Sequence, residues 1–284
     1  MLGSGSGGNA TLLIDKDTRV LIDVGLSCRE VARRLDQIGT DPASIDAIVI
    51  THAHGDHTRG ARLFSKRHSV PVYSTAAVRE EWDVQGLFDW HVLIPSQVQD
   101  VGRLHFYSLV VPHDASQTVA FRIETSAGVV GFATDIGILT DELIQLFQDC
   151  CVLAIESNHS VELLRVSPYA ASTRARIASA NGHLSNESLA EFIRTRLPGT
   201  VRCIVLVHLS RVNNVPEIAE LTCREALLAC GREDVQVVVT RQDRVSPTVD
   251  LENLAIPGRL SSDGTQEGLP FGQLSMEKVS EAGR

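Results

Sequence analysis

One short segment constrains this chain more than any other. It is Thr51-His52-Ala53-His54-Gly55-Asp56-His57, which follows the apolar run Ile45–Ile50. Two histidines two residues apart can reach one metal ion from a loop, and the Asp-His pair that follows can turn to a second ion nearby. Imidazole and carboxylate groups suit zinc, iron or manganese. A buried strand would give these donors a rigid base, so we predict a metal site rather than a histidine-rich surface loop.

Three later segments each place one suitable donor at the end of an apolar run. The donors are His113, Asp135 and His208, and aliphatic residues dominate the run before each of them. A strand that ends in a single polar residue delivers that residue to the edge of a sheet, where functional loops gather. One such residue would fit a core or surface position equally well. Three of them, together with the histidine segment, favour metal ligands.

Short apolar runs alternate with amphipathic stretches along the chain, which predicts an α/β fold. The expected strands are Thr11–Asp15, Val20–Asp23, Ile45–Ile50, Val70–Tyr73, Leu104–Val111, Thr118–Glu124, Val129–Ala133, Val152–Ile155, Cys203–Val207 and Val235–Val239. The expected helices are Cys28–Ile38, Thr58–His68, Asp141–Gln148, two stretches around Pro168, Asn186–Arg196 and Pro216–Cys230. The halves 1–130 and 131–250 each supply strands and helices, which suits two stacked sheets flanked by helices.

The composition is that of an acidic globular protein. The 284 residues carry a net charge of −9 and are 43% hydrophobic, so a sizeable core can form. The charge argues against a protein that coats nucleic acid through a broad basic surface, but a local cationic site could still act on nucleic acid. A basic rim could form after the histidine segment, although a solvated helix face explains these residues more simply: Arg59, Arg62, Lys66 and Arg67.

Cysteine usage and the chain ends bear on the compartment and the domain boundary. The six cysteines include no CxxC pair, so we expect reduced thiols in a core rather than disulfides. Neither a signal peptide nor an apolar run of about 18 residues is visible, so we expect a cytoplasmic protein without a membrane span. The alternating pattern stops near Ile256. We therefore expect a catalytic domain over 1–256 and a disordered tail over 257–284.

The candidate ligands occur in an order that resembles the five motifs of the metallo-β-lactamase superfamily. The resemblance implies an αββα sandwich, in which two mixed β-sheets are flanked by helices. It also implies two divalent ions, of zinc, manganese or iron, and a bridging hydroxide as the nucleophile. In that arrangement Asp23 orients the metal-binding loop through hydrogen bonds, and Asp135 bridges the ions. One ion would be held by His52, His54 and His113, and the other by Asp56, His57 and His208.

Two further segments narrow the resemblance. Glu156-Ser157-Asn158-His159 and Gly182-His183-Leu184-Ser185-Asn186-Glu187 resemble the YycJ (WalJ) family, bacterial proteins regarded as DNA exonucleases. They are also similar to the Glu and Gly-His-Ser-Thr elements of tRNA 3′-processing endonucleases. This implies that His183 contacts the scissile phosphate and protonates the leaving oxygen, while Glu156 orients His183. We therefore predict three catalytic residues: Asp56, Glu156 and His183. Alternatively, Ser185 only caps a helix and His183 is a surface residue.

Three other residues are expected near the substrate or the ligands. His159 either contacts a phosphate or donates a hydrogen bond to a ligand, and Ser185 begins a helix whose first N–H groups would favour a phosphate oxygen. Asn213 lies in His208-Leu209-Ser210-Arg211-Val212-Asn213-Asn214, which resembles the family's His-Leu-Ser-x-Glu-Asn-Asn, with Val212 replacing the usual Glu. The glycine-rich start, 3–10, resembles the family's Ser-Gly-Ser-Ser-Gly-Asn-Ala. Its amides either approach the site or belong to a flexible terminus.

The sequence therefore predicts a two-metal phosphodiesterase that acts on DNA, an exonuclease of the YycJ type. The alternative is a hydrolase of carbon-acid substrates such as a β-lactam, a lactone or a thioester, because the histidine segment permits all of these chemistries. A third interpretation is a metal-stabilised binding protein without catalysis. The complete set of ligands argues against that third interpretation.

Overall fold

Two β-sheets form the centre of the fold in the computed structural model, which describes residues 1–82 and 85–254. The first sheet contains, in spatial order, β1 (Thr11–Asp15), β2 (Thr18–Ile22), β3 (Ala47–Val49), β4 (Val72–Ser74) and β5 (Trp90–Val92). The second contains β12 (Gln236–Val239), β11 (Cys203–Val207), β10 (Val152–Glu156), β9 (Gly128–Ala133), β8 (Thr118–Thr125), β7 (Leu104–Val111) and β6 (Val98–Val101). Both sheets mix parallel with antiparallel pairs.

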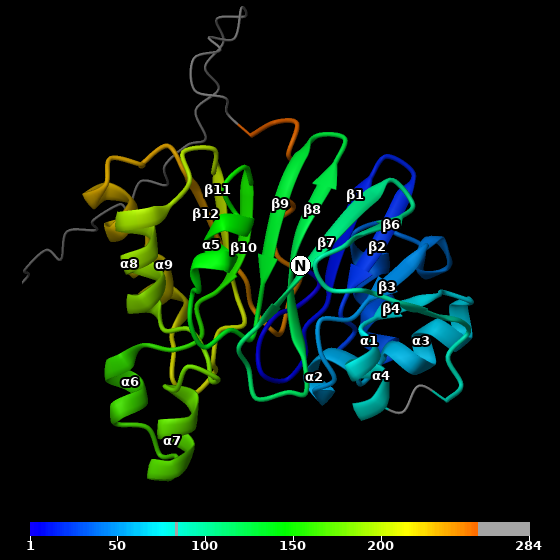
Figure 1. Cartoon of the computed structure of the whole chain (residues 1–284), viewed down its shortest axis with the longest axis horizontal. Coiled ribbons are helices and arrows are strands. Elements are labelled where there is room, and N and C mark those ends of the chain that lie inside the picture. The colour runs from blue at the N-terminus through cyan, green and yellow to red at the C-terminus, as the bar shows by residue number, and fades with distance from the viewer. Residues whose placement is uncertain (83–84, 255–284) are drawn as a thin grey trace, which may run out of the picture. The chain divides into compact units, whose positions relative to one another are not determined.

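Helices cover the outer face of each sheet (Figure 1). Against the first sheet lie α1 (Cys28–Gln37), α3 (Ala61–His68) and α4 (Ala76–Glu81). Against the second lie α5 (Asp141–Leu146), α8 (Asn186–Arg196) and α9 (Pro216–Ala229). The connections carry α2 (Gly55–Thr58), α6 (Val161–Arg165), α7 (Ala171–Ile177) and a 3₁₀ turn at Pro42–Ser44. This is the αββα sandwich that the sequence predicts.

Side-chain alternation along the strands produces the layers, because successive residues of a strand face opposite sides of the sheet. On β10, Val152 and Ala154 enter the core between the two sheets. Leu153 and Ile155 of the same strand pack in the core beneath the helices. A strand buried on both faces must be apolar throughout, which is why such strands are visible as continuous runs in the sequence.

The structure confirms each predicted strand and helix in type, with ends shifted by a few residues, but it corrects the division into sheets. The first sheet ends at Val92 and the second begins at Val98, whereas we expected the boundary near residue 130. The cause is that β6, β7, β8 and β9 pair antiparallel in succession and so extend a single sheet. Strands β5 and β6 were not predicted, because both are short and largely exposed.

The helix expected over Thr58–His68 is interrupted before α3. The N–H of Gly60 donates to the carbonyl of Val24 at 2.8 Å, which takes it out of the helical pattern. A Cβ at Gly60 would lie 2.1 Å from the carbonyl oxygen of Leu26, so glycine permits this approach. Phe64 of α3 is buried against the first sheet, whereas Leu63 beside it is 59% exposed.

The predictions on the tail, the membrane span and the cysteines can be compared with the described residues. The predicted tail over 257–284 lies outside them, so the domain boundary at 256 stays a prediction. No helix within residues 1–82 and 85–254 has the length and apolar character needed to span a membrane. All six cysteines are free thiols in this structure, as the sequence predicts.

The loop after β2 rests directly on the histidine segment. The N–H of Val24 donates to the carbonyl of His57 at 2.8 Å, and the N–H of Gly25 donates to the carbonyl of Asn9 at 2.7 Å. A Cβ at Gly25 would lie 1.5 Å from the carbonyl oxygen of Asp56. Glycine is therefore required at this position for the two loops to touch.

Gly25→Ala should force these two loops apart. We expect the free energy of unfolding to fall by about 3 kcal/mol, because the added methyl group meets backbone that is held on both sides. Gly199→Ala is the control, since no atom lies within 4 Å of its added Cβ. It should change stability by less than about 0.5 kcal/mol. Urea unfolding followed by circular dichroism measures both, and equal stability of the two variants would contradict the contact.

Candidate metal centre

Polar donors from both sheets meet at one end of the sandwich. The histidine segment follows β3, His113 follows β7, Asp135 follows β9 and His208 follows β11. Strands β7, β9 and β11 run in the same direction, so their carboxyl ends lie at the same edge of the second sheet. In α/β proteins ligands bind outside the carboxyl ends of such strands. The fold thus brings together donors that are far apart in the sequence.

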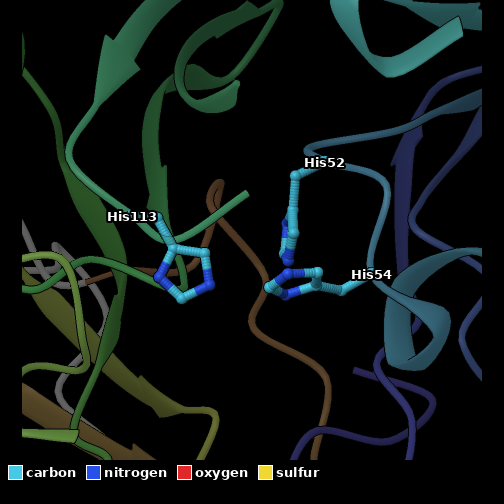
Figure 2. A group of neighbouring side chains, drawn as sticks. All are labelled: His52, His54 and His113. Atoms are coloured by element: carbon cyan, nitrogen blue, oxygen red, sulfur yellow. The ribbon is translucent and has the colours of Figure 1, made fainter. Parts of the chain in front are cut away.

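His52, His54 and His113 form the first group of candidate ligands, shown in Figure 2. One ring nitrogen from each lies within 4.8 Å of the other two. His52 and His54 come from the loop after β3, and His113 faces them from the end of β7. The ring of His113 has its centre 5.3 Å from that of His52 and 5.2 Å from that of His54. The three rings therefore point into one shared space.

Asp56, His57 and His208 form the second group, with one ligand atom from each within 4.8 Å of the others. Oδ2 of Asp56 is 3.6 Å from Nε2 of His57 and 3.5 Å from Nε2 of His208. The carboxylate of Asp135 lies between the two groups. Its Oδ2 is 3.1 Å from Nε2 of His57, and its Oδ1 is 3.7 Å from Nε2 of His113. Asp135 thus contacts a member of each group.

The second ring nitrogen of the candidate imidazoles contacts polar groups of the protein. Nδ1 of His52 is 3.0 Å from the hydroxyl of Thr51, and Nδ1 of His113 is 3.1 Å from the carbonyl oxygen of Gly182. Such contacts fix the direction of the ring in metal sites. Among the described residues, Nε2 of His52, His113 and His208 is buried without a hydrogen-bond partner. An unpaired buried nitrogen costs about 1–3 kcal/mol, so these donors fit divalent cations that accept nitrogen ligands.

Asp23 holds the histidine segment in place. Its Oδ1 accepts the N–H of Thr51 at 2.9 Å, and its Oδ2 lies 2.7 Å from Nδ1 of His57. The hydroxyl of Thr51 also donates to this carboxylate at 2.9 Å. Since one buried carboxylate binds both the loop backbone and a ring, it determines where Nε2 of His57 points.

Glu156 is fully buried at the end of β10 and accepts four hydrogen bonds. Its Oε1 accepts from Nδ1 of His183 at 2.9 Å and from Nδ1 of His208 at 2.8 Å. Its Oε2 accepts the N–H groups of Ile136 at 2.8 Å and Leu184 at 3.3 Å. One carboxylate therefore binds both a candidate metal ligand and the candidate general acid. The sequence suggested the link to His183 but not the link to His208.

Most of the chain matches a known family. Residues 18–209 match the profile of the β-lactamase superfamily domain. The chain is 31% identical over 261 residues to exodeoxyribonuclease WalJ of Streptococcus pneumoniae, and this match covers 88% of the chain and 97% of that protein. The chain belongs to the metallo-β-lactamase superfamily. Exodeoxyribonuclease YycJ of Bacillus anthracis is 27% identical over 80% of this chain and 88% of its own length.

A solved structure of the superfamily shares the fold. The metallo-β-lactamase fold protein YhfI from Bacillus subtilis superposes with a TM-score of 0.65 over 85% of this chain and 95% of that one, at 16% identity. The superfamily fold implies divalent metal ions, and the two ligand groups are suitable residues to hold them. The protein is therefore a metal-dependent hydrolase.

Carboxylates and imidazoles in this superfamily site shift one another's pKa values. Burial lowers the pKa of His208, but the neighbouring carboxylates of Asp135, Asp56 and Glu156 outweigh burial and raise this pKa to about 10. Burial also lowers the pKa of His57, but Asp135 and Asp23 outweigh burial and hold this pKa well above its usual range. Conversely, burial raises the pKa of Asp135, yet His208 and His57 outweigh it and hold this pKa well below its usual range. The carboxylate therefore stays ionised near neutral pH and is available to cations.

The remaining residues singled out from the sequence are buried beside the site. Ser185 is the N-cap of α8, and its hydroxyl accepts the N–H of Ser188 at 3.0 Å. The backbone of His159 pairs with that of Ser185, and the N–H of Asn213 donates to the hydroxyl of Ser210 at 3.1 Å. In the described residues His159, Ser185 and Asn213 make no hydrogen bond to a candidate metal ligand. Their roles toward a substrate stay predictions.

The glycine-rich segment 3–10 packs against the site and is not a loose terminus. The hydroxyl of Ser4 accepts the N–H of His208 at 2.8 Å and donates to Oδ1 of Asn9 at 3.1 Å. Nδ2 of Asn9 lies 3.0 Å from Nε2 of His57. Ser4 and Asn9 thus connect candidate ligands that come from different sheets. Sequence reasoning missed these two residues, although the glycine and serine pattern of the family was a signal.

Added zinc or manganese should stabilise the folded protein. At a free metal concentration about 100 times Kd, binding contributes about 2.7 kcal/mol, and for a domain of this size Tm should rise by roughly 5–10 °C. His52→Ala removes a candidate ligand and should lose much of this rise. His105→Ala is the control, because His105 lies at the other end of β7, where it bonds Asp100. Differential scanning fluorimetry of EDTA-treated protein measures the rise, and an undiminished rise in His52→Ala would exclude His52 as a ligand.

Proposed function

We propose that this hydrolase is a two-metal phosphodiesterase that removes nucleotides from DNA ends. The observation that carries the proposal is the His183–Glu156 pair beside the two ligand groups. The ring of His183 has its centre 5.3 Å from that of His113 and 5.2 Å from that of His208. Its side chain is 19% exposed. His183 therefore borders both the candidate ligands and the solvent from which a substrate enters.

His183 is positioned to donate a proton to a leaving oxygen. Glu156 binds its Nδ1, so Nε2 is the nitrogen left for a substrate. Burial lowers the pKa of His183, but Glu156 and Asp135 outweigh burial and raise this pKa above its usual range. A raised pKa favours the protonated ring, which is the form that general acid catalysis requires. Cleavage of DNA needs such an acid, because an alkoxide leaves poorly without a proton.

The candidate ligands would hold two divalent ions, which lower the pKa of bound water and stabilise charge on the attacking and leaving oxygens. Asp135 contacts both groups and would bridge the ions. Two divalent ions would offset the charges of the carboxylates gathered here, so a phosphate could bind at the site although the chain carries a net charge of −9. One ion would be held by His52, His54 and His113, and the other by Asp56, His57 and His208.

DNA as the substrate rests on the relatives. WalJ and YycJ are both named exodeoxyribonucleases, and the similarity to WalJ spans 97% of that protein. The cysteines of this chain are free thiols in the described structure, as is usual in a reducing compartment. Both points agree with an enzyme that acts on DNA in the cytoplasm.

His183→Ala should affect DNA far more than an activated diester. With manganese or zinc, we expect cleavage of end-labelled DNA from one end, and the variant should lower kcat by about 10²–10⁴-fold. The loss on bis-p-nitrophenyl phosphate should be much smaller, because p-nitrophenolate leaves without being protonated. His105→Ala should behave as the wild type on both substrates.

Two results would contradict this proposal. One is the absence of metal-dependent cleavage of both DNA and the diester by the wild type. The other is turnover of nitrocefin or a homoserine lactone in place of phosphodiesters, which would identify a carbon-acid hydrolase. If His183→Ala lowers kcat equally on DNA and on bis-p-nitrophenyl phosphate, His183 is not the general acid.

Glu156→Gln keeps the size of the side chain but removes the charge that four donors share. We expect the free energy of unfolding to fall by about 1.5–3 kcal/mol, since hydrogen bonds to a buried charged group are lost. The rate of DNA cleavage should fall by at least about tenfold, because His183 loses the partner that orients it. Glu162→Gln is the control, as Glu162 is exposed and pairs with Arg165. Identical stability and rate in the two variants would show that Glu156 has no part in the site.

A further inference from the structure

An arginine on a helical insert lies at the rim of this site and has no part in the chemistry proposed so far. The insert, residues 160–182, contains α6 and α7 and connects β10 with His183. Both helices lie outside the two sheets, at the lower left of Figure 1. Within a chain of net charge −9, the insert is locally cationic, with one acidic residue against three basic ones: Glu162, Arg165, Arg174 and Arg176.

Asp114 links Arg176 to the first ligand group. Nη1 of Arg176 donates to Oδ2 of Asp114 at 2.7 Å. The other oxygen of this carboxylate, Oδ1, is 3.2 Å from Nε2 of His113 and 3.7 Å from Nε2 of His54. Only one carboxylate therefore separates the guanidinium from two candidate metal ligands. Sequence reasoning missed Asp114, although its place directly after His113 was an available signal.

Most of the Arg176 guanidinium is available to a further partner. The side chain is 63% exposed, and the hydrogen bond that it makes within the described residues uses Nη1 alone. A guanidinium has five N–H donors, so four are not used by this bond. Exposed ion pairs contribute little energy. Asp114 can therefore orient the guanidinium and still leave it able to bind a further anion. Arg174, by contrast, donates to the backbone carbonyls of Ser167 and Tyr169.

We propose that Arg176 binds a phosphate of the DNA strand next to the scissile phosphate, with Asp114 holding the guanidinium in position. This inference rests on the proposed phosphodiesterase function. A planar guanidinium matches two phosphate oxygens at once, and contacts to backbone phosphates position nucleic acid without reading its sequence. A substrate with a single phosphodiester group offers Arg176 nothing to bind. The contact therefore favours polynucleotide chains over small diesters.

Arg176→Ala should weaken the use of DNA and leave a small diester unaffected. We expect KM for single-stranded DNA to rise about tenfold, as for the loss of one charge-assisted contact. The value of kcat should stay within about twofold, because the contact is equally strong in the ground state and the transition state. The slope of log(kcat/KM) against log salt should become shallower by roughly 0.7. Kinetic constants for bis-p-nitrophenyl phosphate should not change.

Arg176→Lys and Arg165→Ala complete the test. The lysine keeps a point charge but not the planar fork. Arg176→Lys should therefore keep the wild-type salt slope, with a KM between those of the wild type and Arg176→Ala. Arg165→Ala is the matched control, because Arg165 is another exposed arginine of the insert that pairs with a carboxylate, at 2.8 Å from Glu162. Equal losses in Arg165→Ala and Arg176→Ala would reduce the effect to general charge and overturn the proposal. An equal loss on DNA and on the small diester would overturn it as well.

A binding measurement separates this inference from the proposed function. Fluorescence anisotropy of labelled single-stranded DNA with EDTA-treated protein needs no cleavage. Kd should rise about tenfold for Arg176→Ala and stay at the wild-type value for Arg165→Ala. If the wild type binds DNA but cleaves none, the proposed function fails while the comparison of Kd values still tests Arg176. Equal Kd values for the wild type and Arg176→Ala would overturn the inference.

Discussion

Three carboxylates at one end of the sandwich are almost completely removed from water, and their charge has to be balanced there. Asp23, Asp135 and Glu156 are each no more than 2% exposed. Taking an ionised group out of water costs several kcal/mol unless partners replace its hydration. Imidazoles supply these partners, with His57 beside Asp23 and His208 beside Glu156. His57 follows β3 of the first sheet and also lies 3.1 Å from Asp135, which follows β9 of the second. Charge balance therefore ties the two sheets together at this end.

Much of this arrangement could be predicted from the sequence for a simple physical reason. A strand buried on both faces is a continuous apolar run, so its end is visible, and a polar donor placed there marks the edge of a sheet. His113, Asp135 and His208 were found in this way. The histidine segment is recognisable because its donors are close together in the sequence. Family resemblance then pointed to Glu156 and His183, which no local periodicity would distinguish from other polar residues.

Contacts between distant segments could not be predicted in this way. Asn9 and His57 are 48 residues apart, and Glu156 and His208 are 52 residues apart. The pairing of such residues depends on how the strands are ordered, which the composition of each run does not encode. The same limit explains the misplaced boundary between the sheets, since it depends on the hairpins that join β6 to β9. Short, exposed edge strands such as β5, which has only three residues, are too brief for an alternating pattern to be recognised.

Asp23, Asp135 and His208 share a backbone conformation that most side chains avoid. Their φ angles are 58°, 55° and 55°, in the left-handed region. A residue with a Cβ pays about 1 kcal/mol or more there, although Asp and His tolerate it better than most. Glycine would relieve the strain at each of these turns and would remove the donor at the same time. It would also leave their buried partners unpaired, at about 1–3 kcal/mol each, so relieving the strain would lose more stability than it returns. The same three side chains therefore maintain both the fold and the site.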